Sequence, residues 1–303
     1  MKGLSNFTHV ALIILIVTPI VFGSYIFLKE FTIELGIASG MLSLFIIGVV
    51  ILPLLFIKFI NVELLEKRPL MAFLLSSFFI IIGFISSLFI FYSELSIGMI
   101  AISSLLILPF VTKILQYHKE KKKKSRVFIK SILVKHDKII EFYISLFFGM
   151  VLSYIFLFSI IPSHIVDVSF QHQLSKFSPG DFVSPPFFEI IKNNLVIVVI
   201  AFSFSVFYGA GSIFVLNYNA SIIGAFYGFI LRSFLYSMPI SINIVSLIPH
   251  TFLEILAYLL ASIAGGILAH GKKDYKDATT FFVLSILLIV IAGYFEVTVA
   301  GKF

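Results

Sequence analysis

The chain has 303 residues, of which 60% are hydrophobic and 12% charged, and its mean hydropathy is +1.12. This composition excludes a water-soluble domain, because soluble domains carry about twice that share of charge and a single core could not bury so much apolar surface. Cysteine is absent, which excludes disulfides, thiolate metal sites and a cysteine nucleophile.

A membrane-spanning helix needs about 20 largely apolar residues. Nine stretches of the chain meet this requirement, so we predict an all-α, polytopic bundle of about nine transmembrane helices. In chain order they are 10–28, 37–60, 70–92, 95–115, 139–161, 195–216, 221–236, 249–269 and 279–299. The first stretch has an alternative interpretation as a signal peptide cleaved after Gly23.

A strongly basic loop at 117–138 fixes the predicted orientation. It carries nine basic and two acidic residues, and nine minus two equals the whole net charge of +7. Basic loops stay in the cytoplasm, which places the N-terminus inside and the C-terminus outside. We expect the loop to contact anionic lipid rather than nucleic acid, because no aromatic binding platform accompanies it. Its basic residues are Lys119, Lys121, Lys122, Lys123, Lys124, Arg126, Lys130, Lys135 and Lys138.

The basic loop divides the chain into a four-helix region at 1–116, the loop itself at 117–138, and a five-helix domain at 139–303. The first region has no ionisable group in the middle of a span, which is typical of an anchoring bundle, although a lipid-facing lid or docking surface is an alternative. In the second domain, apolar residues from Val166 to Phe177 recur at helical spacing. They predict a short helix lying in the outer membrane interface.

Polar residues of the last domain predict a cluster near the outer leaflet. Two asparagines, Asn193 and Asn194, open the sixth span, and Pro249 is expected as the first residue of the eighth. Arg232 and Glu254 then lie at matching depths on consecutive helices, with His250 one turn from Glu254. Because an isolated charge in hydrocarbon costs at least about 2.5–3.5 kcal/mol, we expect an Arg232–Glu254 ion pair. It is either a structural pair that fixes helix registry or part of a proton-handling or ligand-binding site.

Small residues toward the cytoplasmic side predict close helix packing. The seventh span carries a G-x-x-x-G motif, and small residues repeat at the same spacing in the eighth. A stretch at 266–272 is similar to a phosphate-binding loop, but Lys273 stands where Ser or Thr is needed and no strand precedes it, so we exclude a nucleotide site. No cofactor or metal site is predicted. The packing glycines are Gly209, Gly211, Gly224, Gly228, Gly265 and Gly266.

The second domain resembles the stage II sporulation protein M family over residues 139–303. The resemblance rests on Asn193–Asn194, the glycines of 202–211, the predicted turn at 217–220 with Gly224, the stretch 249–254, and the small residues of 261–266. Two positions depart from the family pattern: Thr251 replaces a glycine after Pro-His, and Ala220 replaces the glycine of Asn-Gly. The resemblance implies a non-enzymatic membrane component that associates with envelope protein partners.

Two functions remain open from the sequence. The first is a non-enzymatic scaffold in the cell membrane that assembles partner proteins, using the outer segment and the level of Arg232, His250 and Glu254. The second is a small-solute transporter or lipid-handling protein that uses the same cluster. An intramembrane enzyme is disfavoured, because His250 and Glu254 come without a nucleophile or a third metal ligand.

Overall fold

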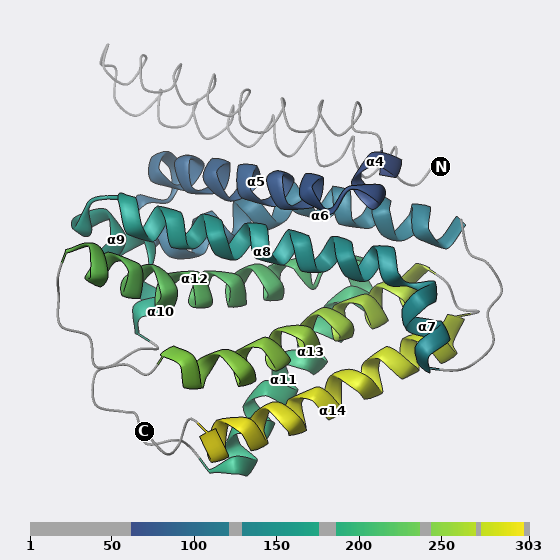
Figure 1. The fold of residues 1–303 in the computed structure, drawn as a ribbon. Coiled ribbons are helices and arrows are strands. Elements are labelled where there is room, and N and C mark those ends of the chain that lie inside the picture. The colour runs from purple at the N-terminus through teal and green to yellow at the C-terminus, as the bar shows by residue number, and fades with distance from the viewer. Residues whose placement is uncertain (1–61, 121–128, 176–185, 237–243, 271–273, 300–303) are drawn as a thin grey trace. The chain divides into compact units, whose positions relative to one another are not determined.

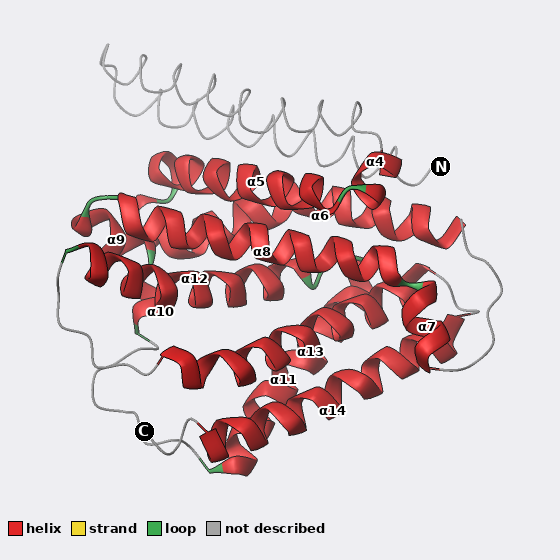
Figure 2. Cartoon of the chain, viewed as in Figure 1, coloured by secondary structure: helices red, strands yellow, loops and turns green. Residues whose placement is uncertain are grey.

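The computed structural model describes residues 62–120, 129–175, 186–236, 244–270 and 274–299 (Figure 1). Within these ranges all regular structure is helical, as Figure 2 shows, so the predicted all-α membrane fold is confirmed. The predicted spans at 10–28 and 37–60, and the possible cleavage site after Gly23, lie outside the described residues.

Seven of the described helices are long and apolar enough to cross a membrane, and they correspond to the third through ninth predicted spans. Shorter helical segments lie before and between these long helices. The helices are α4 (Val62–Lys67), α5 (Pro69–Ile90), the 3-10 turn η2 (Tyr92–Glu94), α6 (Leu95–Glu120), α7 (Ile129–Lys135), α8 (Asp137–Ile160), α9 (Ser163–Ser169), α10 (Gln171–Leu174), α11 (Phe187–Tyr208), α12 (Ile213–Leu235), α13 (Ile244–His270) and α14 (Tyr275–Val299).

The long helices pack as two groups, which Figure 1 shows above and below one another. The first group joins α5, α6, α8 and α12, with α8 packed against both α5 and α12. The second group joins α11, α13 and α14, which all contact one another. Chain neighbours α12 and α13 make few contacts with each other. Sequence order therefore does not decide which of these helices are packed together.

All of these helices run between two ends of the bundle. We call one the basic-loop end: there α6 ends, α8 begins, and the chain passes from α13 to α14. The opposite end, where α8 and α12 end and α11 begins, is called the far end. The predicted orientation would make the basic-loop end cytoplasmic.

The turn between α11 and α12 differs from the prediction. It was expected at 217–220, but α11 ends at Tyr208 and α12 already begins at Ile213. The chain reverses at Gly209, whose φ of 71° lies in the left-handed region that side-chain-bearing residues avoid. This glycine thus supplies the turn, and Asn217 is free to enter the helix and the core.

Close packing of α12 on α8 follows the G-x-x-x-G motif. A Cβ atom at Gly224 would collide with Cβ of Tyr154, and one at Gly228 would collide with Cβ of Phe158. Both glycines therefore let the two helix backbones approach more closely than any other residue would permit. Gly265 plays a similar part where α13 meets Phe202 of α11.

The segment between α8 and α11 forms two short helices where a single one was predicted. The helix is interrupted at Phe170, and the two short helices α9 and α10 fold against the bundle, with Val166 4% and Phe170 0% exposed. Gln173 is also fully buried: its Oε1 accepts from Ser96 of α6, and its Nε2 donates to Ser221 of α12. These hydrogen bonds fix the segment against α6 and α12.

Candidate functional site

Near the far end, Glu254 lies inside the second helix group. The side chain of Asn194 on α11 connects two residues of α13: its Nδ2 donates to Glu254 Oε1, and its Oδ1 accepts from the hydroxyl of Tyr258 at 2.7 Å. Glu296 on α14 is close enough to repel the Glu254 carboxylate. We call Asn194, Glu254 and Tyr258 the far-end cluster. Among the described residues, no cationic side chain forms an ion pair with Glu254.

Arg232 lies apart from the far-end cluster, on the other helix group. Its Nη1 donates to the backbone carbonyl of Phe158 at 3.0 Å and to that of Ile161 at 2.8 Å, where α8 ends. Its guanidinium also lies 5.6 Å from the ring centre of Tyr236. The last carbonyls of a helix have no intrahelical donor and lie at the negative end of the helix dipole. They are therefore good hydrogen-bond acceptors for a cationic side chain.

The predicted Arg232–Glu254 ion pair is therefore wrong. Its two helices, α12 and α13, are consecutive in the chain, but α12 packs mainly on α8, and α13 packs mainly on α14 and α11. Pro249 also lies inside α13, which begins at Ile244, and not at its first position. An inference from matching depth could not identify the neighbours of each helix.

The other residues predicted for this level are separated. Asn193 is exposed on α11, whereas its neighbour Asn194 faces α13. His250 is buried at 8% exposure, but the hydrogen bonds of Glu254 do not include it. Of the five predicted residues, the structure thus brings together Asn194 and Glu254, and it adds Tyr258, which the sequence interpretation had missed.

We expect Arg232→Leu to destabilise the fold by about 1–2 kcal/mol, because hydrogen bonds to charged groups contribute about 1.5–3 kcal/mol and bonds between membrane helices average about 0.6 kcal/mol. Amide exchange at the end of α8, from Leu157 to Ile161, should accelerate. Glu254→Leu should leave that exchange unchanged, and the effects of the two substitutions should add. A clear coupling energy between Arg232 and Glu254 in a double-mutant cycle would contradict the structure.

In the middle of the first helix group, the fully buried Asn217 joins three helices. Its Oδ1 accepts from the hydroxyl of Tyr154 on α8 at 2.9 Å. Its Nδ2 lies within hydrogen-bond distance of Ile100 O, Ser103 Oγ and Ser104 Oγ on α6. An amide nitrogen has two hydrogens, so two of these three acceptors are served at any moment.

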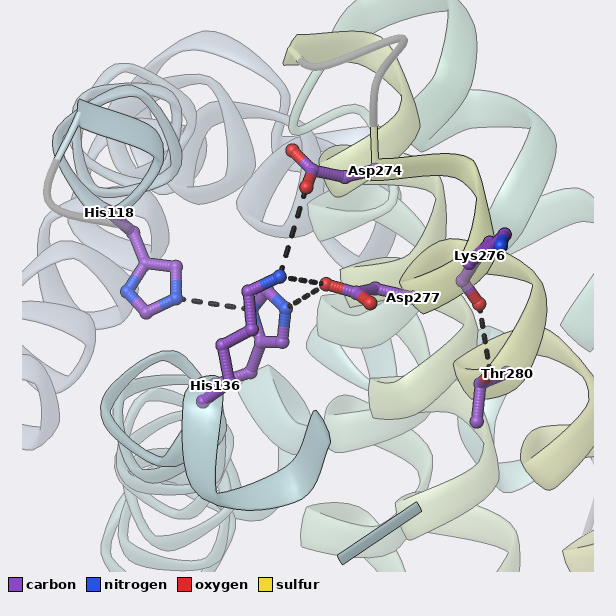
Figure 3. A network of polar contacts seen from close by, with 7 residues as sticks. His118, His136, Asp274, Lys276, Asp277 and Thr280 are labelled. Carbon is purple, nitrogen blue, oxygen red and sulfur yellow. Dashed lines mark hydrogen bonds and ion pairs between the residues drawn. The ribbon is translucent and has the colours of Figure 1, made fainter. Parts of the chain in front are cut away.

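A network of buried polar side chains lies at the basic-loop end, as Figure 3 shows. His118 is on α6 and His136 directly precedes α8, with Nε2 of the first 3.1 Å from Nδ1 of the second. The remaining nitrogen of His118 lies 3.1 Å from Oε1 of Glu66 on α4. The remaining nitrogen of His136 lies 3.0 Å from Oδ2 of Asp277 on α14. Four helical elements therefore meet through two imidazole rings.

Lys135, the last residue of α7, adds a positive charge to this network. Its Nζ donates to Asp277 Oδ2 at 2.7 Å and lies 3.9 Å from Asp274 Oδ1. The rings are well shielded, since His136 is 0% and His118 9% exposed. We call Glu66, His118, Lys135, His136, Asp274 and Asp277 the basic-loop network. In the part of the chain that the structure describes, no three His, Cys, Asp or Glu side chains are placed to hold a metal ion.

The sequence interpretation had missed the basic-loop network. It counted Lys135 as one of nine basic residues that set the orientation in the membrane. It gave no role to His118 and His136, which lie at opposite ends of the loop. Their available signal was position: His118 and His136 flank the loop where spans end, and Asp277 opens the last span at the same end. Histidines at span ends on one side of a membrane are candidates for contact with each other.

The fold and its buried polar groups define a multi-pass helical membrane protein. The family model of stage II sporulation protein M matches residues 139–300, and the chain belongs to this family. It is also 26% identical over 167 residues to an uncharacterized protein of Methanocaldococcus jannaschii, covering 50% of this chain and 91% of that protein. No solved structure matches the chain.

Proposed function

We propose that this protein is a non-enzymatic scaffold of the cell membrane that assembles partner proteins. The observation that carries the proposal is that buried or half-buried polar side chains are bonded between helices. Asn217 joins α6, α8 and α12, Gln173 joins α10 to α6 and α12, and Arg232 joins α12 to the end of α8. These side chains are engaged in bonds between helices, which suits a rigid platform better than a moving transport pathway.

The second helix group offers the surface that such a platform needs. Only 22% of the spanning part of α11 is buried within the chain, compared with 61% for α6 and for α8. Large apolar side chains of α11 are exposed along its length, among them Val196, Ile200 and Phe204. A partner helix docked on α11 would be held by packing, since lipid already satisfies apolar surface and provides no hydrophobic drive.

The scaffold proposal predicts a stoichiometric partner in affinity-purified complexes from native membranes. A bulky substitution on α11, Ile200→Trp, should lower the amount of partner recovered by at least about tenfold, which corresponds to ~1.4 kcal/mol. The matched control is Leu74→Trp on α5, where the side chain is also exposed. Equal recovery from both variants, or a functional protein that purifies without any partner, would contradict the proposal.

Glu254 favours a second candidate function, a transporter of small solutes or lipids. The carboxylate lies within a spanning helix without a cation opposite it among the described residues, and intramembrane carboxylates of this kind serve as proton-handling groups in transporters. Transport or lipid scrambling in liposomes that is abolished by Glu254→Gln would support it. The scaffold predicts the opposite: the amide oxygen introduced by this substitution accepts the same bond from Asn194, and partner recovery stays unchanged.

A further inference from the structure

The two imidazole rings of the basic-loop network constrain their own protons. A hydrogen bond between two ring nitrogens requires one proton between them, because two bare lone pairs repel and two N–H groups collide. Nε2 of His118 and Nδ1 of His136 are 3.1 Å apart, which is within hydrogen-bond distance. One of these facing nitrogens therefore carries a hydrogen and the other does not.

The outer nitrogens of the same rings face carboxylates. His118 Nδ1 lies 3.1 Å from Glu66, and His136 Nε2 lies 3.0 Å from Asp277. An ionised carboxylate only accepts hydrogen bonds, so both outer nitrogens must carry a hydrogen. The pair then holds three ring protons, one more than two neutral imidazoles have.

We propose that His118 and His136 share one extra proton, and that this proton holds α14 against α6 and α8 at the basic-loop end. Two carboxylates and one imidazolium give Glu66, His118, His136 and Asp277 a combined charge of −1. Lys135, bonded to Asp277, supplies a positive charge beside them. Charge compensation of this kind lets the shared proton persist where water is excluded.

The shared proton has a mechanical role because of where Asp277 lies. α14 packs on α13 and α11, within the second helix group, whereas α6 and α8 belong to the first. The bonds of Asp277 to Lys135 and His136 cross from one group to the other. The His118–His136 contact itself joins α6 to α8 within the first group, but loss of the extra proton removes the imidazolium charge beside Asp277. The His136–Asp277 bond between the two groups then loses its charge assistance and weakens.

Other charged and titratable side chains lie on the helices around the network. Those of α8 include Lys138, which bonds Glu141 and also feels the charge of Glu66. Of the side-chain types present, histidine is the one that ordinarily changes charge between pH 5 and 8. The neighbours are Glu63 and Lys67 of α4, Lys113 and Tyr117 of α6, Asp137, Lys138 and Glu141 of α8, His270 of α13, and Tyr275 and Lys276 of α14.

The contact between the two imidazole rings is expected to open at both high and low pH. As pH rises, the shared proton leaves, two lone pairs face each other, and the contact opens. As pH falls, a fourth proton makes both rings imidazolium, two N–H groups face each other, and the contact opens again. The closed state is therefore present in a middle window, and its two midpoints belong to the pair and not to either ring.

The test measures the separation of α14 from α4 across pH. Because the chain has no cysteine, spin labels attach only at introduced sites, and Arg68→Cys with Lys276→Cys places both labels on exposed positions outside the network. In liposomes, pulsed electron resonance should show one short distance in the middle of the range from pH 5 to 9. A second, longer population should appear reversibly at both extremes.

Two variants and one direct measurement complete the test. His118→Gln should remove the pH dependence, whereas the control His172→Gln, near the far end, should retain it. Nitrogen-15 spectra of histidine-labelled protein should show one imidazolium shared by two rings in the middle window; this holds even if His118→Gln does not fold. A distance that is constant from pH 5 to 9, or spectra in which both rings stay neutral, would overturn the proposal.

Discussion

Gly224→Ala should destabilise the protein by about 3 kcal/mol or more, although it adds a single methyl group. The added Cβ would collide with Cβ of Tyr154, and it would lie 3.1 Å from the carbonyl oxygen of Val151 and 3.3 Å from the backbone nitrogen of Ile155. No rotamer change moves these atoms, so α12 and α8 would have to separate. Overpacking with movable neighbours already costs about 1–3 kcal/mol, and here the neighbours are fixed.

The matched control for this substitution is Gly293→Ala on α14. A Cβ there would meet only side chains, at 3.2 Å from Ile191 and 3.5 Å from Ile190 and Phe187. These side chains can shift, and alanine has the better helix propensity, so stability should change by less than about 1 kcal/mol. Unfolding in mixed micelles, followed by circular dichroism, measures both variants. Equal stability of the two would contradict the close contact between α8 and α12.

Asn217→Leu should have the second large effect, about 2 kcal/mol. Leucine has the same branched arrangement of side-chain heavy atoms as asparagine, but it leaves the buried hydroxyl of Tyr154 and the hydroxyls of Ser103 and Ser104 without the amide. A buried polar group that loses its partner costs about 1–3 kcal/mol, and bonds between membrane helices average about 0.6 kcal/mol with values near 2 at the upper end. The high value is expected because one amide serves two helices.

A double-mutant cycle with Tyr154→Phe separates the bond from other effects of the substitution. The single change Tyr154→Phe should cost less than Asn217→Leu, and the two together should cost less than their sum. Asn219→Leu is the control, because that amide bonds the carbonyl of Val215 within its own helix. If Asn219→Leu destabilises the protein as much as Asn217→Leu, the bonds of Asn217 between helices contribute no more to stability than a bond within one helix.

Long apolar stretches predicted the described spans well, because hydrocarbon requires each span to satisfy its own backbone hydrogen bonds as a helix. The packing glycines were also predictable in part: Gly224 and Gly228 lie where the G-x-x-x-G spacing places a close helix contact. Gly209 and Gly211 were assigned to the interior of a span, and they instead form a turn. Hydropathy alone does not distinguish a tight turn made of small residues from a continuous helix.

The candidate site was harder to predict, because side-chain partners depend on which helices are neighbours. Arg232 and Glu254 have matching predicted depth and opposite charge. The guanidinium of Arg232 nevertheless donates its hydrogen bonds to backbone carbonyls at the end of α8. Such acceptors are invisible in a search for charged residues. His118 and His136 were missed for a related reason: each is an ordinary polar residue at a span end until α6, α8 and α14 are placed together.

Burial of Gln173 bears on the order in which the chain is assembled during synthesis. Its amide bonds Ser96, which is made earlier, and Ser221, which emerges from the ribosome only after α11. The buried contact of α10 with α12 therefore cannot form until α12 has been made. A nascent chain arrested before Ser221 would expose this segment to proteases, and release of the arrest should make it resistant.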